Sequence, residues 1–405
     1  MNASSFHAAH LLPPQATIDP NALPYAVLEH LGVVRVAGKD AASFLQAQLT
    51  QDILPLQNGQ ARLAGYCTPK GRLLATFWVI RQDMPGASPT TAAPQTGTAD
   101  ASTDTPASAP DDALPTFWLV CARDIAASIT KRLSMYVLRA KVKVEDASAH
   151  YLLLGFFGQI DEALRPLGAT IGHGAAAPLP TVQLTETTTD LLTTPARQYL
   201  GPERQLFRSL LIIPPEQVAN RTGDDGVIHY RFSANDWLQL AVASGVPWIS
   251  APSQELFVPQ MVNLDLTDGI SFKKGCYPGQ EIVARSKYLG KQKRRMFAGL
   301  CSGQLPLPGT DILAYDGTPI GIVVLAASLA VHGEHPPAPP ETEDGPAPTE
   351  TELLTVACKR YLVLFEARID AVGAQPKSAG MIATSLLIGE AAIGLLQQPY
   401  PMPDI

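Results

Sequence analysis

Apolar positions along this chain follow a strand-like alternation in some stretches and a helical spacing in others. Residues 33–36 form a β-branched run that ends before Gly38, and Ala41, Leu45 and Leu49 then fall on one helical face. Further strands are predicted at 62–66, 73–80, 117–121, 141–144 and 152–157, with a helix over 125–136. Strand and helix mix without the steady βαβ alternation of a parallel sheet, so we expect an α+β fold.

The C-terminal part has a different pattern. From Met296 onward helical spacing disappears, and strand-like runs at 297–301, 320–325 and 361–367 are separated by glycine-containing turns. These runs predict a small terminal β-barrel or sandwich. A last apolar run, 381–396, contains two glycines, and its pattern is compatible with either a helix or a returning pair of strands.

Two segments have the composition of unfolded chain. Residues 84–115 are mostly Pro, Ala, Ser, Thr, Gly and Asp, and residues 332–350 are rich in Pro and acid. Each lies between strand-like runs, so we interpret both as lengthened hairpin loops. We divide the chain into an α+β domain in two parts (21–82 with 195–295), a disordered insertion (83–116), a second α+β domain (117–194), a barrel (296–372, with a disordered loop at 332–350) and a tail (373–405).

Composition limits the cellular setting. The chain has 405 residues, 46% of them hydrophobic, without an apolar run long enough for a membrane span. Residues 1–20 lack the basic and apolar regions of a secretory signal. The five cysteines are far apart and form no CxxC pair. We therefore expect a cytoplasmic protein with no membrane association, no disulfide framework and no metal site.

Charge is distributed unevenly. The formal net charge is −7, yet between Ser271 and Phe297 eight lysines and arginines stand against the single acid Glu281. One interpretation is an ordinary solvated surface. The other is a site that faces an anion, such as a carboxylate-rich ligand, RNA or an acidic partner.

The run Lys273-Lys274-Gly275-Cys276-Tyr277-Pro278-Gly279-Gln280-Glu281 combines several chemical features. Gly275 and Gly279 allow a sharp turn and a close backbone approach to a ligand. Glu281 falls at a predicted helix start, and Arg285 follows at the spacing of an i,i+4 ion pair. Adjacent lysines and the helix start would favour the thiolate of Cys276, which makes it a candidate nucleophile. The alternative is a small buried cysteine.

Trp237 lies in a predicted helix. Its spacing to Leu240 and Ala241 places the three side chains on one face, which is compatible with core packing. The alternative is a flat aromatic wall for a planar ligand.

The same run, followed by Ile282-Val283-Ala284-Arg285, resembles the KGCYxGQE signature of the YgfZ proteins, which are relatives of the glycine-cleavage T-protein. The resemblance extends to most of the chain outside residues 1–20 and the two insertions. It includes 38–52, 67–72, Tyr136 with 141–142, 257–264 and 399–401.

The resemblance implies a three-domain ring of the aminomethyltransferase type around a central hole that holds tetrahydrofolate, with a C-terminal β-barrel. It implies a role in making or repairing iron–sulfur clusters in client enzymes, including one that thiolates tRNA. Carried onto this sequence, the folate-contacting residues are Trp237, Lys274, Gly275, Tyr277, Gln280, Glu281 and Arg285, with Cys276 as the candidate catalytic residue.

Two other functions remain open. One is an aminomethyltransferase of the glycine-cleavage type, although the equivalent loop in that enzyme carries an acid where this chain has Cys276. The other is direct tRNA binding through the basic run. Direct nucleic-acid binding is not expected, because no RNA-binding module of the RNP1 or KH type is evident. The expected partners are folate and iron–sulfur client proteins, and a classical enzyme activity is not expected.

Overall fold

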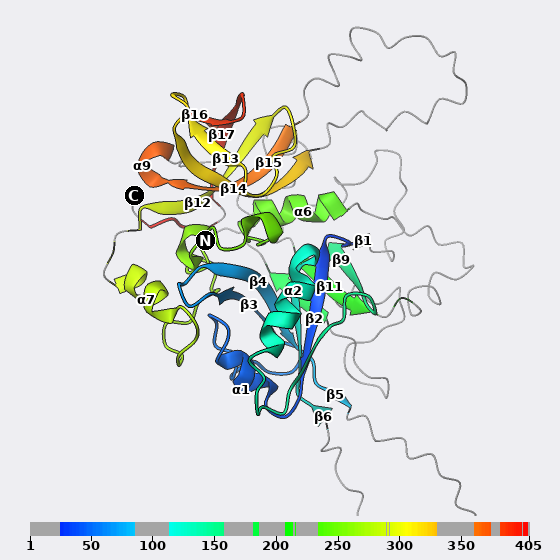
Figure 1. Ribbon diagram of the computed structural model, residues 1–405. Coiled ribbons are helices and arrows are strands. Elements are labelled where there is room, and N and C mark those ends of the chain that lie inside the picture. Colours follow the sequence, from blue (N-terminus) through cyan, green and yellow to red (C-terminus); the bar gives the residue numbers. More distant parts are fainter. Residues whose placement is uncertain are drawn as a thin grey trace, which may run out of the picture.

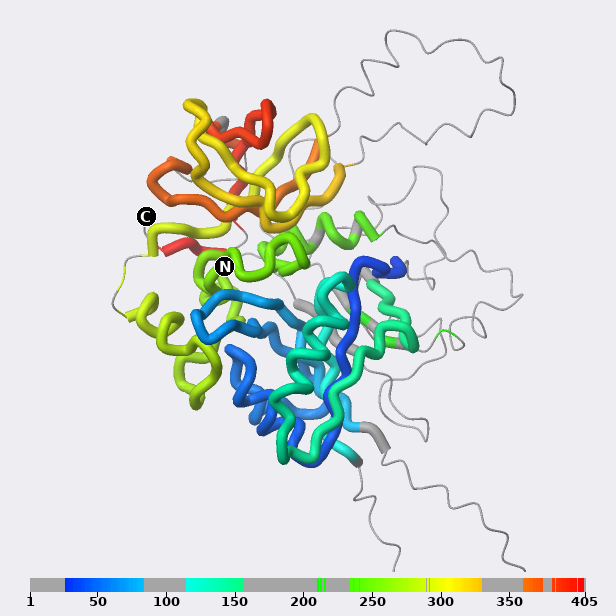
Figure 2. Tube along the Cα trace, in the orientation of Figure 1, coloured from blue at the N-terminus to red at the C-terminus, as the bar shows by residue number. Residues whose placement is uncertain are grey.

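The computed structural model describes residues 25–85, 113–157, 181–185, 207–213, 215, 234–288, 290, 292–329, 360–373, 381–398 and 400–403. Of the predicted disordered insertion 83–116, residues 86–112 lie outside these ranges, whereas its two ends are described and carry short strands. The predicted disordered loop 332–350 lies outside them entirely. Two larger sheets, a two-stranded ladder and a closed barrel make up the described fold (Figure 1). In Figure 2 the barrel, in yellow to red, lies on one side of helix α6, and the blue and cyan first sheet lies on the other.

The first unit is a five-stranded sheet in the order β3-β4-β7-β2-β8, with every neighbouring pair antiparallel. Its elements are β2 (Leu31–Ala37), α1 (Ala41–Gln46), β3 (Ala61–Cys67), β4 (Leu73–Arg81), β7 (Thr116–Ala122), α2 (Arg123–Ser134) and β8 (Lys143–Asp146). Side chains alternate between its faces. Phe77 and Leu119 pack with α1 and α2, whereas Trp78 and Val120 join the central apolar cluster.

The second unit is a four-stranded sheet in the order β1-β9-β11-β10. Its strands are β1 (Tyr25–Val27), β9 (Leu152–Phe157), β10 (Thr181–Thr185) and β11 (Phe207–Ile213). Helix α6 (Ala234–Ala243) lies between this sheet and the barrel (Figure 1). The side-chain amides of Asn235 and Gln239 both donate to the carbonyl of Ser328, at 2.7 and 2.8 Å, so α6 is fixed to the barrel.

The third unit confirms the predicted C-terminal barrel, which closes in the order β12-β15-β14-β13-β16-β17. Its elements are β12 (Arg294–Ser302), β13 (Asp311–Ala314), β14 (Pro319–Leu329), β15 (Arg360–Arg368), the short helix α9 (Ile369–Val372), β16 (Met381–Ile388) and β17 (Ala391–Leu396). The predicted boundary at 372 differs from this arrangement, because β16 and β17 close the barrel against β13 and β12. Closure removes both sheet edges, which explains why the last apolar run is a strand pair.

The predicted boundary between 21–82 and 117–194 also differs from the structure. Strands β4 and β7 lie on opposite sides of that boundary, yet they pair directly, with Trp78 opposite Val120. The short ladder of β5 (Met84–Pro85) with β6 (Ala113–Leu114) extends the same connection. The interpretation of both insertions as lengthened hairpin loops is confirmed, since β14 and β15 likewise pair across the second one. None of the helices in the described ranges has the length and apolar character of a membrane span.

Candidate functional site

The signature loop leads into helix α7 (Gln280–Tyr288), which begins where the sequence predicts. Gly279 has φ +83°, and a Cβ on it would lie 2.5 Å from the carbonyl oxygen of Thr68 and 2.6 Å from the Cα of Gly71. Gly71, in the β3–β4 turn, has φ +71° and would place a Cβ 2.9 Å from that of Ile282. Two sequence motifs more than 200 residues apart therefore pack backbone against backbone, which only glycine allows.

The side chain of Lys274 points into the protein and anchors the loop. Its Nζ donates to the carbonyl oxygens of Gln46, Leu49 and Gln51, at 2.6, 2.6 and 3.0 Å, at the end of α1. The ammonium also lies 5.2 Å from the ring centroid of Tyr277. The residue is only 8% exposed, and this burial lowers the pKa of Lys274 to about 8. Lys274 thus faces the protein interior, and a contact of its side chain with folate stays a prediction.

Tyr277 and Gln280 support the same loop. Tyr277 is buried, and this burial raises the pKa of its hydroxyl, with a smaller contribution from Cys67. The side-chain amide of Gln280 donates to the carbonyl of Lys274 at 3.5 Å. In the described residues both side chains therefore stabilise the loop, and a contact of either with folate stays a prediction.

Cys276 is exposed, and a Cβ on the neighbouring Gly275 would meet no atom within 4 Å. The other described cysteines are buried, and burial raises the pKa of Cys67 to about 12 and that of Cys301 to about 11. Of the alternatives that the sequence left open, the buried structural cysteine does not describe Cys276. Its thiol is accessible on a loop held by Lys274.

Glu281 and Arg285 are exposed on α7. They form no ion pair with each other or with another described side chain, so the pair that their spacing permits is not made. Contact of either residue with folate stays a prediction.

Trp237 lies on α6 and is 0% exposed. A Cβ on Gly155 of β9 would lie 2.4 Å from its ring, and the His30 ring centroid is 6.5 Å away. Burial lowers the pKa of His30 to about 4. The core-packing alternative therefore describes Trp237 in this conformation, and a contact of its ring with folate stays a prediction.

Three tryptophans that the sequence analysis did not select are also candidates for contact with a polar ligand. The indole N–H groups of Trp78, Trp118 and Trp248 are buried and lack hydrogen-bond acceptors among the described residues. All three belong to or pack against the central apolar cluster. The period-two alternation of β4 and β7, which places Trp78 and Trp118 on one face, could have identified two of them.

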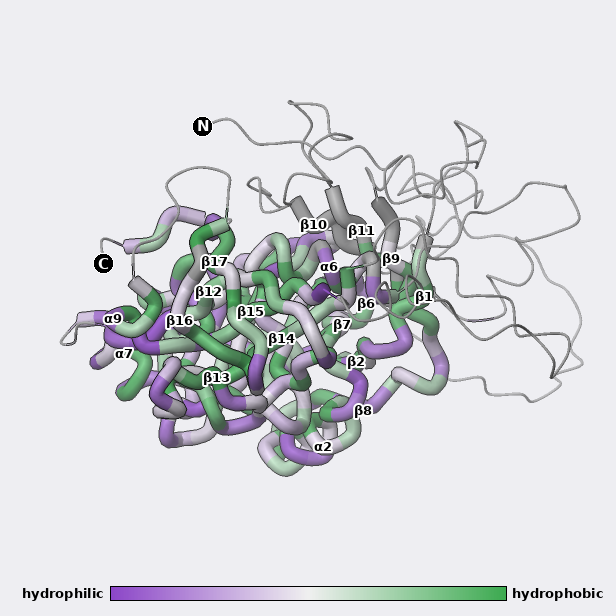
Figure 3. Tube along the Cα trace, turned by 90° about the horizontal axis from the view of Figure 1, so that it is seen from above, coloured by the Kyte–Doolittle hydropathy of each residue, from purple (hydrophilic) through white to green (hydrophobic). Residues whose placement is uncertain are grey.

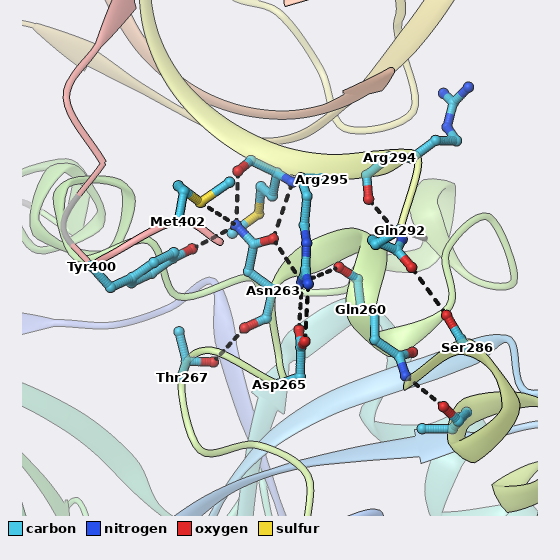
Figure 4. A network of polar contacts seen from close by, with 12 residues as sticks. Gln260, Asn263, Asp265, Thr267, Ser286, Gln292, Arg294, Arg295, Tyr400 and Met402 are labelled. Carbon is cyan, nitrogen blue, oxygen red and sulfur yellow. Dashed lines mark hydrogen bonds and ion pairs between the residues drawn. The ribbon is translucent and has the colours of Figure 1, made fainter. Parts of the chain in front are cut away.

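A polar network joins the signature region to the barrel and the C-terminal segment (Figure 4). The guanidinium of Arg295 donates to both carboxylate oxygens of Asp265, at 2.6 and 3.1 Å, and to the carbonyl of Gln260 at 3.0 Å. The amide of Asn263 donates to the carbonyl of Met296 at 2.8 Å and to the hydroxyl of Tyr400 at 3.0 Å. The barrel is therefore fixed relative to the loop.

Comparison with known proteins agrees with the sequence motifs. No family model matches the chain. A tRNA-modifying protein YgfZ from Edwardsiella ictaluri is 31% identical over 265 residues, which cover 65% of this chain and 67% of the relative. This chain belongs to the YgfZ family. Proteins of the same name from Klebsiella pneumoniae and Hamiltonella defensa are 29% and 27% identical, over 74% and 70% of this chain and 79% and 72% of theirs.

The fold of this YgfZ-family chain is that of an aminomethyltransferase. The crystal structure of the glycine cleavage system aminomethyltransferase T from Bartonella henselae superposes with a TM-score of 0.53. The superposition covers 93% of this chain and 85% of that protein at 13% sequence identity. The predicted fold class is thereby confirmed. Among the described residues, no three His, Cys, Asp or Glu side chains gather as they do around a metal ion.

Proposed function

We propose that this chain is a tetrahydrofolate-binding accessory protein that supports the assembly or repair of iron–sulfur clusters in client enzymes, including enzymes that thiolate tRNA. The YgfZ-family sequence and the aminomethyltransferase fold support this proposal. The observation that carries it is the exposed Cys276 on a loop that Lys274 and the Gly71–Gly279 contact hold in place. A fixed, accessible thiol is the part of the site that could act on a client.

The chemistry of the central cluster is compatible with folate. The indole N–H groups of Trp78, Trp118 and Trp248 have no acceptors within the part of the chain that the structure describes, and a pterin ring carries carbonyl and ring-nitrogen acceptors. Buried donors without partners cost about 1–3 kcal/mol each, so a ligand that accepts from them is favoured. Bound tetrahydrofolate would supply a reduced pterin that carries one-carbon units. In this proposal the tryptophans orient the ring and the apolar cluster around them excludes water.

Titration of the full-length protein with tetrahydrofolate under anaerobic conditions tests the ligand. We expect saturable binding, and Trp118→Phe should weaken it about 5- to 30-fold because one hydrogen-bond donor is lost. Phe117→Leu is the matched control, since Phe117 is buried on the opposite face of the same strand. Absence of binding at millimolar tetrahydrofolate would refute the folate part.

Complementation of a bacterial strain that lacks its own YgfZ-type protein tests the cellular role, with thiolated tRNA as the readout. We expect the wild-type chain to restore thiolation. Cys276→Ser should fail to restore it while still binding folate, because the serine keeps the size of the side chain but not the thiol. A wild-type chain that is expressed and folded yet restores nothing would overturn the accessory role.

A further inference from the structure

The basic run of 273–295 separates in the structure into inner and outer charges. Three of its cations point inward. Lys274 binds the carbonyls described above, Arg294 pairs with Glu366, which has 1% side-chain exposure, and Arg295 pairs with Asp265, which has 2%. These cations have partners within the fold, so they cannot serve a ligand outside it.

The remaining described cations of the run are exposed. They are Lys273, Arg285, Lys287 and Lys293. Lys291 lies outside the described residues. Glu281 is the only acid of the run, so the outer charge is strongly positive although the whole chain is negative. A local field of this sign attracts an anionic surface.

Large apolar side chains lie among these charges. Tyr288 is 68% exposed and Ile282 is 41% exposed. The Tyr288 ring packs edge-on against Phe272, with centroids 6.1 Å apart, and the Nζ of Lys287 lies 5.4 Å from the same Phe272 ring. We name the exposed residues Lys273, Ile282, Arg285, Lys287, Tyr288 and Lys293 the α7 face. A basic rim around exposed aromatic and aliphatic groups is the composition of a protein interface.

Packing and hydrogen bonds with the rest of the fold hold the α7 face in place. Val283, on the side of the helix away from Arg285 and Tyr288, is fully buried, and its carbonyl accepts from the Gln260 amide at 2.6 Å. Ser286 donates to the side chain of Gln292, whose amide donates to the carbonyl of Arg294 at the start of the barrel (Figure 4). The helix therefore has little conformational entropy to lose when a partner binds, and this favours association.

We propose that the α7 face docks an acidic surface of the iron–sulfur client protein, which brings that client to the thiol of Cys276. The inference rests on the proposed function. Cys276 precedes the helix by four residues, so a partner seated on the helix lies beside the loop. Figure 3 shows hydrophilic residues along α7, at one end of the molecule.

Charge favours a protein over RNA as the occupant. The phosphates of an RNA extend beyond a patch of this size, onto a molecule with a net charge of −7, where they are repelled. An acidic protein surface can match the patch alone. Ile282 also offers an aliphatic contact that suits a protein better than a nucleotide.

The test compares two doubly charge-reversed variants of the full chain, with a purified tRNA-thiolating iron–sulfur enzyme immobilised as the probe. Lys287→Glu with Lys293→Glu changes the α7 face. Lys131→Glu with Arg139→Glu makes the same change in net charge at exposed positions at and after the end of α2. We expect the first variant to bind about tenfold more weakly and with a reduced salt dependence, and the second to bind like the wild type.

Equal affinities for the two variants would overturn the docking proposal, as would loss of binding to purified tRNA with client binding unchanged. Folate binding separates this result from the proposed function, because neither variant alters the central cluster. A variant that binds folate but not the client supports the α7 face. A wild type that binds neither refutes the proposed function itself.

Discussion

The inner and outer cations of the run 273–295 carry the same charge but differ in burial and in the partners that they find within the fold. Arg295 is 7% exposed and is held by Asp265, whereas Lys293, two residues earlier, is exposed and makes no described side-chain contact. Lys274 donates to three carbonyl oxygens, whereas its neighbour Lys273 is exposed. A cation removed from water must find acceptors in the fold, and one that stays in water need not. Local charge read from a sequence therefore overstates the charge that a partner meets.

Removal of the most deeply paired cation should have the largest effect. Arg295→Met leaves the Asp265 carboxylate buried without a partner, and we expect a loss of about 3–5 kcal/mol in the free energy of unfolding. Urea unfolding followed by tryptophan fluorescence measures it. The double variant Arg295→Met with Asp265→Leu removes both charges and should recover much of the loss. A single variant within about 1 kcal/mol of the wild type would contradict a buried, partnered arginine.

A largely buried imidazole whose Nε2 has no hydrogen-bond partner among the described residues should be neutral in the folded protein, and His30 tests this. Burial lowers its pKa from 6.5 to about 4 in the folded protein. Between these pH values the unfolded chain binds more protons than the folded one, so stability falls as the pH falls from 6.5 to 4, by roughly 2–3 kcal/mol.

His30→Phe should remove this part of the pH dependence in urea unfolding. Leu28→Ala, a fully buried neighbour, should lower stability by the same amount at every pH in that range. An unchanged slope in the His30 variant would show that the imidazole is not the titrating group.

The spacing of apolar residues and glycines was sufficient to predict the elements that neighbouring residues determine. The strand over 152–157, the start of α7 at Gln280 and the hairpin that turns at Gly71 are where the sequence indicates. The family motifs also identified the loop around Cys276. What remained hidden was which way each side chain points, because that depends on segments distant in the chain.

Lys274 and Trp237 illustrate that limit. The acceptors of Lys274 lie more than 220 residues away, at 46–51, and they are backbone carbonyls, which have no sequence signature. Trp237 is buried because Gly155 gives it space, a pairing that no pattern within either segment contains. At the insertion 83–116 the hairpin-loop interpretation was correct, whereas the domain boundary drawn there differs from the direct pairing of β4 with β7. A low-complexity loop can join two paired strands as well as two domains.

Adjacent lysines offer a sharp comparison of the two environments. Lys274→Met leaves three carbonyls of the α1 end without a donor, and we expect a loss of about 1–3 kcal/mol and faster hydrogen exchange at 46–52. Lys273→Met should stay within about 0.5 kcal/mol of the wild type. Urea unfolding and exchange mass spectrometry measure both. Equal losses for the two lysines would contradict the inward position of Lys274.

The smallest effect is expected at Glu281, which tests whether the outer charges support the fold at all. Glu281→Gln removes the single acid of the run, and since Glu281 has no described ion pair, no pairing energy is lost. The carboxylate does lie in the first turn of α7, where a helix dipole favours it by about 0.3–1 kcal/mol at an exposed site. We therefore expect a small loss in urea unfolding that high salt abolishes, because salt screens an exposed charge. A loss that persists in 1 M salt would mean that Glu281 has a partner within the fold and belongs with the inner charges.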